Sequence, residues 1–131
     1  MDRIFDPTRK RYVALTPEEK VRQTFVKFLL SKKYPLEAIK TEVFLDFEGQ
    51  KRRADIVVFH KQKPLMIVEC KSTKINISKS TFEQVWQYFY SLGAKYLVLT
   101  NIDKTFICKI EHKKCIFLKD FPSFEQLKLD L

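Results

Sequence analysis

Two short apolar segments, Ala54–Phe59 and Leu65–Cys70, limit most strongly what this chain can fold into. Both are rich in Val and Ile and are apolar nearly throughout, which is typical of central strands covered on both faces of a sheet. Only residues 60–64 separate them, a polar connection of the length that a β-hairpin uses. The two segments therefore predict neighbouring antiparallel strands in the middle layer of an α/β protein.

A helix is predicted before this hairpin, over residues 16–33. The sequence T-P-E-E at its start is typical of a capping box, with Thr16 as the N-cap and the Glu19 side chain reaching back to it. The apolar residues that follow recur at helical spacing and define an inward face: Val21, Phe25, Phe28 and Leu29. We assign Glu18 to this face because it lies three residues before the first of them. The outer face would carry Lys20, Arg22, Gln23 and Lys27.

Further elements complete the predicted fold. A second amphipathic helix spans Ser78–Leu92 and ends at Gly93, while residues 1–15 are polar and unpatterned and are expected to form an arm. Additional strands are expected at 43–47, 95–100, 105–110 and 115–118, with a short helix at 123–127. The sequence thus predicts a single α/β domain over residues 1–131, in which helices flank a mixed central sheet of four to five strands.

The charge of the chain points to a polyanionic partner. It has 131 residues, 25 of them basic and 16 acidic, which gives a net charge of +9 and a pI near 9.5. Such an excess favours binding to nucleic acid, although charge alone is weak evidence. No apolar run approaches the ~20 residues of a transmembrane helix, and the N-terminus has no secretory apolar region. We therefore expect no association with a membrane.

The cysteines support neither a disulfide framework nor a zinc site. There are three of them, Cys70, Cys108 and Cys115, and none belongs to a C-x-x-C pair. A structural zinc site would need about four nitrogen or sulfur ligands in recognisable spacing. The sequence is consistent with reduced cysteines in a cytoplasmic protein.

The chemistry suggested by the sequence is concentrated at one end of the predicted hairpin. Asp55 opens the first strand, and Glu69 and Lys71 end the second, so an antiparallel pairing brings them together. Because Glu69 and Lys71 are two residues apart, they should point to the same face. Two adjacent carboxylates repel each other unless a cation lies between them, and Mg²⁺ prefers such oxygen ligands together with water and phosphate. The arrangement predicts metal-assisted hydrolysis of a phosphodiester.

At these residues the chain resembles the PD-(D/E)xK nuclease superfamily, in which D…E-x-K lies on a hairpin after an opening helix. More narrowly, T-P-E-E-K-V-R-Q, R-R-A-D-I-V-V-F, I-V-E-C-K and F-E-Q-V-W-Q-Y resemble the N-terminal domain of type I restriction enzyme R subunits. The resemblance covers roughly residues 16–101. It implies a three-layer restriction-endonuclease-like core. Ala54 stands where the superfamily has a proline, and no ATP-driven activity is implied because no helicase motor follows in this sequence.

The resemblance also implies roles for individual residues in a Mg²⁺-dependent DNA endonuclease of a restriction or defence system. Mg²⁺, or Mn²⁺ as a substitute, would be held by Asp55, Glu69, the backbone carbonyl of Cys70 and an acid of the opening helix. We choose Glu18 for that acid, since Glu19 is expected to cap the helix. The remaining residues implied in catalysis or substrate binding are Lys71, Gln84, Tyr88, Arg52, Arg53 and Lys74. DNA is the expected partner, with other restriction-system subunits; a homodimer stays open.

Simpler interpretations of the same residues remain. Glu69 and Lys71 could be a solvated strand end, and Gln84 and Tyr88 could be ordinary residues of an amphipathic helix. The main alternative function is a nuclease-like module that binds DNA or a partner protein without cutting. The intact set of two acids and a lysine favours the enzyme, because a module that only binds DNA has no need of converging carboxylates. Nothing in the sequence discriminates DNA from RNA.

Overall fold

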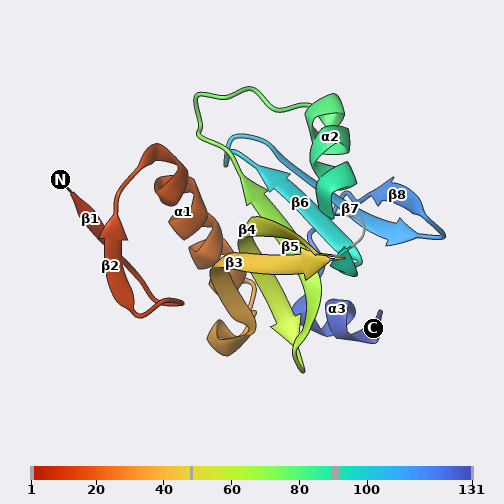
Figure 1. Cartoon of the computed structure of the whole chain (residues 1–131), viewed down its shortest axis with the longest axis horizontal. Helices are drawn as coiled ribbons and strands as arrows, with labels where there is room; N and C mark the ends of the chain where they lie inside the picture. Colours follow the sequence, from red (N-terminus) through yellow and green to blue (C-terminus); the bar gives the residue numbers. More distant parts are fainter. Residues whose placement is uncertain (1, 48, 90–91, 131) are drawn as a thin grey trace.

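A six-stranded mixed sheet forms the middle layer of the protein in this computed structural model, which describes residues 2–47, 49–89 and 92–130 (Figure 1). Its strands lie in chain order, and all neighbours are antiparallel except β5 and β6, which are parallel. The mixed sheet confirms the prediction, and the last hairpin extends it to six strands rather than four or five. The strands are β3 (Ile39–Phe47), β4 (Gln50–His60), β5 (Lys63–Cys70), β6 (Tyr96–Thr100), β7 (Thr105–Glu111) and β8 (Lys114–Phe117).

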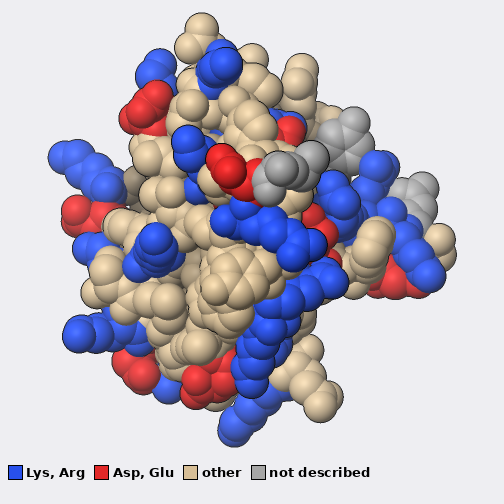
Figure 2. Space-filling model, turned by 90° about the vertical axis from the view of Figure 1, so that its left-hand side faces the viewer, with Lys and Arg blue, Asp and Glu red and all other residues tan. Residues whose placement is uncertain are grey.

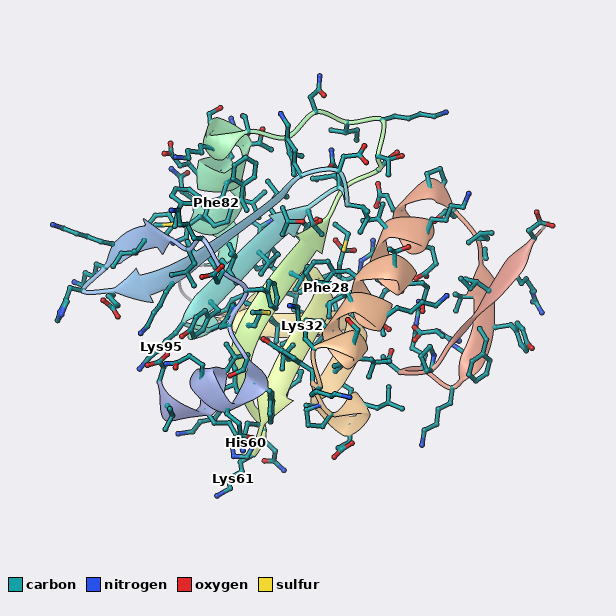
Figure 3. The ribbon with its side chains drawn as sticks, turned by 180° about the vertical axis from the view of Figure 1, so that it is seen from behind. Phe28, Lys32, His60, Lys61, Phe82 and Lys95 are labelled. Carbon is teal, nitrogen blue, oxygen red and sulfur yellow. The ribbon has the colours of Figure 1, made fainter. Side chains whose placement is uncertain are left out.

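Helices α1 (Pro17–Ser31) and α2 (Lys79–Phe89) cover the two faces of the sheet, as the three-layer prediction requires (Figure 1). The alternation along β4 divides its side chains between them. Ile56 and Val58 belong to the apolar cluster under α1, whereas Val57 belongs to the cluster under α2. Phe28 of α1 and Phe82 of α2, both labelled in Figure 3, contribute to these separate clusters. The hairpin β4–β5 is therefore buried on both faces, which explains its continuous apolar sequence.

The start of α1 differs from the predicted capping box. Thr16 is the N-cap and its hydroxyl accepts a hydrogen bond from the Glu19 backbone N–H. The Glu19 side chain does not return to Thr16 but instead accepts bonds from arginines and from Gln23. Arg22 and Gln23, predicted on the outer face, are 4% and 2% exposed. The prediction was wrong because buried carboxylates, not only apolar side chains, face α1.

Residues 3–14 form a hairpin, where the sequence predicted an unpatterned arm over residues 1–15. Strands β1 (Arg3–Asp6) and β2 (Arg11–Ala14) make a separate two-stranded sheet on the outer side of α1 (Figure 1). Asp6 is fully buried and anchors this hairpin by accepting hydrogen bonds from Thr8, Arg9 and Thr41. Local sequence patterns missed the anchor because Thr41 lies 35 residues away in the chain.

The C-terminal part closes the face of the sheet that α1 covers. Helix α3 (Phe124–Leu129) is capped by the Ser123 hydroxyl and inserts the buried Leu127 into the cluster under α1. A single turn of 3-10 helix, η1 (Leu36–Ala38), joins α1 to β3. Among the described residues the cysteines are free thiols. In the same part of the chain, no helix has the length and apolar character needed to cross a membrane.

Candidate functional site

The pairing of β4 with β5 ends just where the predicted acids lie. The last paired residues are Ile56 and Val68, so continuing the same register places Asp55 opposite Glu69 as the strands separate. The Asp55 Oδ2 atom accepts a hydrogen bond of 2.8 Å from the backbone N–H of Cys70. Asp55 thus bridges the gap between the separating strands, and its carboxylate takes the place of a ladder hydrogen bond.

On its other side, Asp55 is bound by an arginine of α1. The Arg22 Nη2 atom donates to Asp55 Oδ1 at 2.8 Å, and both side chains are almost completely buried. Burial acts to lower the pKa of Arg22, but Asp55 and Glu19 outweigh it and hold this pKa well above its usual range. The Asp55 carboxylate is therefore fixed by one partner on each oxygen.

Strand β3 is irregular beside Asp55. Its register with β4 is the same at the Thr41–Ile56 pair and at the Val43–Ala54 pair, which places Glu42 opposite Asp55, although these two residues do not form a ladder pair. Glu42 has a φ of +50°, a left-handed conformation that side chains other than Gly adopt with strain. Its carboxylate lies 3.2 Å from Arg22 Nη1 and 3.4 Å from Arg9 Nη1. Glu42 is thus an ion-pair partner of the same two arginines that bind Glu19.

Glu69 and Lys71 are held much more loosely. The Lys71 Nζ atom lies 3.9 Å from Glu69 Oε1, and the two side chains are 35% and 19% exposed. Burial, followed by the charge and hydrogen bond of Asp55, raises the pKa of Glu69 to about 8 in spite of Lys71. The two carboxylates are therefore close enough to repel each other, as the sequence predicted for Asp55 and Glu69.

The donor set fits a divalent cation in chemistry but is only partly assembled. Mg²⁺ prefers carboxylate ligands, and two adjacent carboxylates repel each other when both are negatively charged. A cation between them would remove the repulsion. However, within residues 2–47, 49–89 and 92–130, no three His, Cys, Asp or Glu side chains gather as ligands for a metal ion. The backbone carbonyl of Cys70, water and phosphate are further oxygen ligands of the kind that Mg²⁺ prefers.

The structure separates the two acids at the start of α1. Glu19 is 4% exposed and binds Arg9 and Arg22, whereas Glu18 is exposed rather than packed on the inward face. Both line a cleft of about 580 Å³ between the N-terminal hairpin, α1 and the loop after β5. After burial and Asp55, the charge of Glu18 makes a smaller contribution to the raised pKa of Glu69. Glu18 is thus within electrostatic range of Glu69, while Glu19 supports Arg22.

The other residues implied by the resemblance are dispersed. Arg52 and Arg53 are exposed on β4, and Arg53 lines the same cleft as Glu18. Lys74 is exposed in a neighbouring cleft of about 520 Å³, which shares Pro17 and Ser72 with the first. Gln84 is exposed on α2 and lines neither cleft, and the side chain of Tyr88 lies outside the described residues. Figure 2 shows basic side chains over much of the face formed by the hairpin and α1, with acidic groups in smaller separate areas.

The sequence analysis missed the ionic network that supports Asp55. It runs from the hairpin through α1 to the sheet and consists of Asp6, Arg9, Glu19, Arg22, Glu42 and Asp55. One signal was available: Glu19 and Arg22 are three residues apart and therefore adjacent on a helix. That spacing cannot show whether the pair is buried, and so the network is visible only in the structure.

Comparison with solved structures gives the same fold. A fragment of a candidate HsdR subunit of a type I restriction enzyme from Vibrio vulnificus YJ016 matches 89% of this chain with a TM-score of 0.66 and 20% identity. The match covers 25% of that protein, so the chain spans about a quarter of its length. A candidate nuclease of the DUF820 group from Anabaena variabilis ATCC 29413 matches 93% of this chain and 82% of that one, with a TM-score of 0.59 and 13% identity. No curated protein sequence matches the chain.

The family of the chain follows from its sequence together with this fold. Residues 17–122, from the first residue of α1 to the segment before α3, match the family described as the type I restriction enzyme R protein N terminus (HSDR_N). The matched range includes Asp55, Glu69 and Lys71, so the resemblance predicted from the motifs is confirmed. The protein is a nuclease-like, restriction-enzyme-related domain and belongs to the family of type I restriction enzyme R protein N termini.

Proposed function

We propose that the protein is a metal-dependent endonuclease that hydrolyses phosphodiester bonds of DNA. The observation that carries this proposal is the placement of Asp55 opposite Glu69 at the end of the β4–β5 pairing, with the Lys71 ammonium 3.9 Å from Glu69. A structural role alone does not explain two neighbouring carboxylates, since the repulsion between their like charges lowers the free energy of unfolding. Membership of a restriction-enzyme family supports DNA and other restriction-system subunits as partners.

Each residue of the site has a distinct task in this proposal. Mg²⁺, or Mn²⁺ in its place, would be held by Asp55, Glu69 and the Cys70 carbonyl with Glu18 nearby, and would offset charge on the scissile phosphate. Arg22 and the Cys70 N–H orient the Asp55 carboxylate. Lys71 orients the attacking water or stabilises the charge that develops in the transition state. Arg52, Arg53 and Lys74 bind phosphates, and Gln84 and Tyr88 would approach the substrate from α2.

A second candidate function is favoured by one observation. Both oxygens of Asp55 already have protein partners, Arg22 and the Cys70 N–H. An arginine on a carboxylate neutralises the charge that a metal ion would otherwise neutralise. The alternative is therefore a module of the same fold that binds DNA through its basic face and does not cut it.

The two candidates differ in a direct assay. The whole protein is incubated with supercoiled plasmid and with single-stranded DNA, in Mg²⁺, in Mn²⁺ and in EDTA. The nuclease proposal expects cleavage with either metal and none in EDTA. It also expects Glu69→Gln to abolish cleavage and to weaken metal binding measured by calorimetry in the presence of an uncleavable DNA analogue. Glu111→Gln, on the far hairpin β7–β8, is the matched control and should cut like the parent.

The outcome decides between the candidates. DNA binding without cleavage under all these conditions, together with unchanged metal binding in Glu69→Gln, would support the non-cutting module. Cleavage that persists in Glu69→Gln would contradict the assignment of the site.

A further inference from the structure

The N-terminal hairpin exposes two aromatic rings on its outer face. Phe5 and Tyr12 are directly opposite each other in the β1–β2 register, and they are 47% and 62% exposed. Their ring centroids are 5.3 Å apart at an interplanar angle of 70°, an edge-to-face contact. In this geometry the face of one ring stays open to solvent. Two adjacent aromatic side chains that are exposed to water form a contiguous apolar patch, and such patches often mark binding sites.

Basic residues surround this aromatic pair. Arg3 lies two residues before Phe5 on the same strand and therefore on the same face. Lys10 and Arg11 are exposed at the turn end of the hairpin. The outward-facing residues of the two strands are Arg3, Phe5, Tyr12 and Ala14, so none of the residues on this face of the strands is acidic. The face thus combines an open ring with positive charge on both sides of it.

The hairpin is fixed relative to the candidate site. Its inward face carries Asp6, which is fully buried, and the turn carries Arg9, which binds Glu19 at 2.6 Å. Glu19 in turn binds Arg22 at 2.7 Å, and Arg22 binds Asp55. The ionic network therefore connects the hairpin to the middle of β4. The cleft that contains Glu18 lies between the hairpin and the sheet, lined by the inward-facing Val13 on one side and by Arg53 on the other.

We propose that the outer face of the β1–β2 hairpin, defined by Arg3, Phe5 and Tyr12 and bordered at the turn end by the exposed Arg11, is a stacking platform for single-stranded nucleic acid. Aromatic rings stack on bases, and arginines next to them neutralise phosphates, which is how proteins bind single strands without reading sequence. A paired duplex does not offer the faces of its bases, so the open ring selects single strands over duplex. The hairpin lies outside residues 17–122, the range shared with the family. The inference goes beyond the proposed hydrolysis, because it concerns binding and does not require that the site cuts.

The test measures binding in EDTA, where the hydrolysis proposed above cannot occur. Fluorescence anisotropy compares a labelled oligo-dT strand with a labelled duplex of equal length at low salt. The double variant Phe5→Leu/Tyr12→Leu keeps apolar side chains but removes the rings. It should weaken single-strand binding roughly tenfold or more and leave duplex binding within about twofold. Leu129→Ala, an exposed apolar residue on α3, is the matched control and should change neither affinity.

The basic residues have a different expected signature. Arg3→Gln/Arg11→Gln should weaken the binding of both the single strand and the duplex. The salt dependence of binding should fall by the equivalent of about two released counterions. The control is Lys61→Gln/Lys95→Gln, since both lysines are exposed and Figure 3 shows them at the far end of the sheet from the hairpin. Equal losses for single strand and duplex in the aromatic variant would overturn the stacking proposal. So would sedimentation showing that the parent self-associates and the aromatic variant does not, because the face would then be a dimer contact. The aromatic variant should show the parent's circular dichroism, so that a loss of binding reports the rings.

Discussion

Asp55 and Glu69 lie opposite each other where the pairing of β4 with β5 ends, but their carboxylates have very different partners. Asp55 has a protein donor at 2.8 Å on each oxygen and is almost completely buried. Glu69 has its cationic neighbour at 3.9 Å, and its pKa is raised to about 8 by burial and by Asp55. One carboxylate is therefore positioned by the fold in its charged form, whereas the surroundings of the other disfavour its charge and favour a bound proton.

This difference distinguishes the residues that stabilise the fold around Asp55 from the residues that could act on a substrate, Glu69 and Lys71. The buried arginine network on the Asp55 side resembles the interior of a folded domain, in which each charge has a close partner. On the other side, Lys71 is 35% exposed and its contact with Glu69 is long, so neither charge is held by a close partner in that pair. Substitutions on the Asp55 side should therefore change stability, and substitutions on the Glu69 side should change function.

The largest effect on stability is expected for Arg22→Ala. Removal of this arginine leaves the buried Asp55 without the cation that binds it and leaves Glu19 with Arg9. Breaking a buried ion pair from one side lowers the free energy of unfolding by about 3–5 kcal/mol. Urea denaturation followed by circular dichroism measures the loss. Lys27→Ala, an exposed residue on the same helix, should change the free energy of unfolding by less than about 0.5 kcal/mol. Equal midpoints for the two variants would mean that Asp55 does not depend on Arg22.

The opposite behaviour is expected for Lys71→Ala. The side chain is 35% exposed and makes a long contact with Glu69, so its loss should leave the denaturation midpoint nearly unchanged. If the site cuts DNA as proposed, the rate of cleavage should fall roughly a hundredfold, the scale of one lost electrostatic or proton-transfer contact. Lys104→Ala, exposed after β6, is the control for removal of a positive charge. Cleavage at the parental rate in Lys71→Ala would contradict the role given to this lysine.

These two expectations show how much could be predicted from the sequence. The strands, the two covering helices and the convergence of Asp55, Glu69 and Lys71 depend on local periods of 2 and 3.6 residues and on one short hairpin, so they could be predicted. The contact of Arg22 with Asp55 spans 33 residues, and the contact of Thr41 with Asp6 spans 35. Local periodicity carries no information about such pairs. For the same reason Glu18 and Arg22 were assigned to the wrong faces of α1, whereas Lys20 and Lys27 are exposed as predicted.

A smaller effect, with a defined dependence on pH, is expected for Asp6→Asn. Burial acts to raise the pKa of Asp6, but hydrogen bonds from Arg9, Thr41 and Thr8 outweigh it and hold the pKa well below its usual range. The folded protein therefore keeps Asp6 ionised where the unfolded chain takes up a proton. The stability from Asp6 is fully present above its ordinary pKa of 3.8 and decreases as the pH falls below that value.

Asp6→Asn should accordingly lower the free energy of unfolding by about 1–3 kcal/mol at neutral pH and by less in acid. Denaturation midpoints between pH 7 and pH 3 measure this convergence of variant and parent. Asp103→Asn, at an exposed carboxylate, should follow the parent at every pH. A difference between Asp6→Asn and the parent that grows toward low pH would have the wrong sign for this explanation.

The smallest effect is expected at the far end of the sheet, and it tests whether burial or proximity makes the Arg22 contacts matter. Lys109 Nζ lies 2.8 Å from Glu111 and 3.2 Å from Asp130, distances like those around Arg22, but its side chain is 22% exposed. In Lys109→Ala, Asp130 still accepts a hydrogen bond from the Tyr96 hydroxyl and can be hydrated. The free energy of unfolding should therefore fall by less than about 1 kcal/mol, and the difference should shrink further as salt screens the pair. A loss as large as that of Arg22→Ala, unchanged by salt, would show that short distance alone determines the stabilisation and that the contrast between Asp55 and Glu69 cannot be attributed to burial.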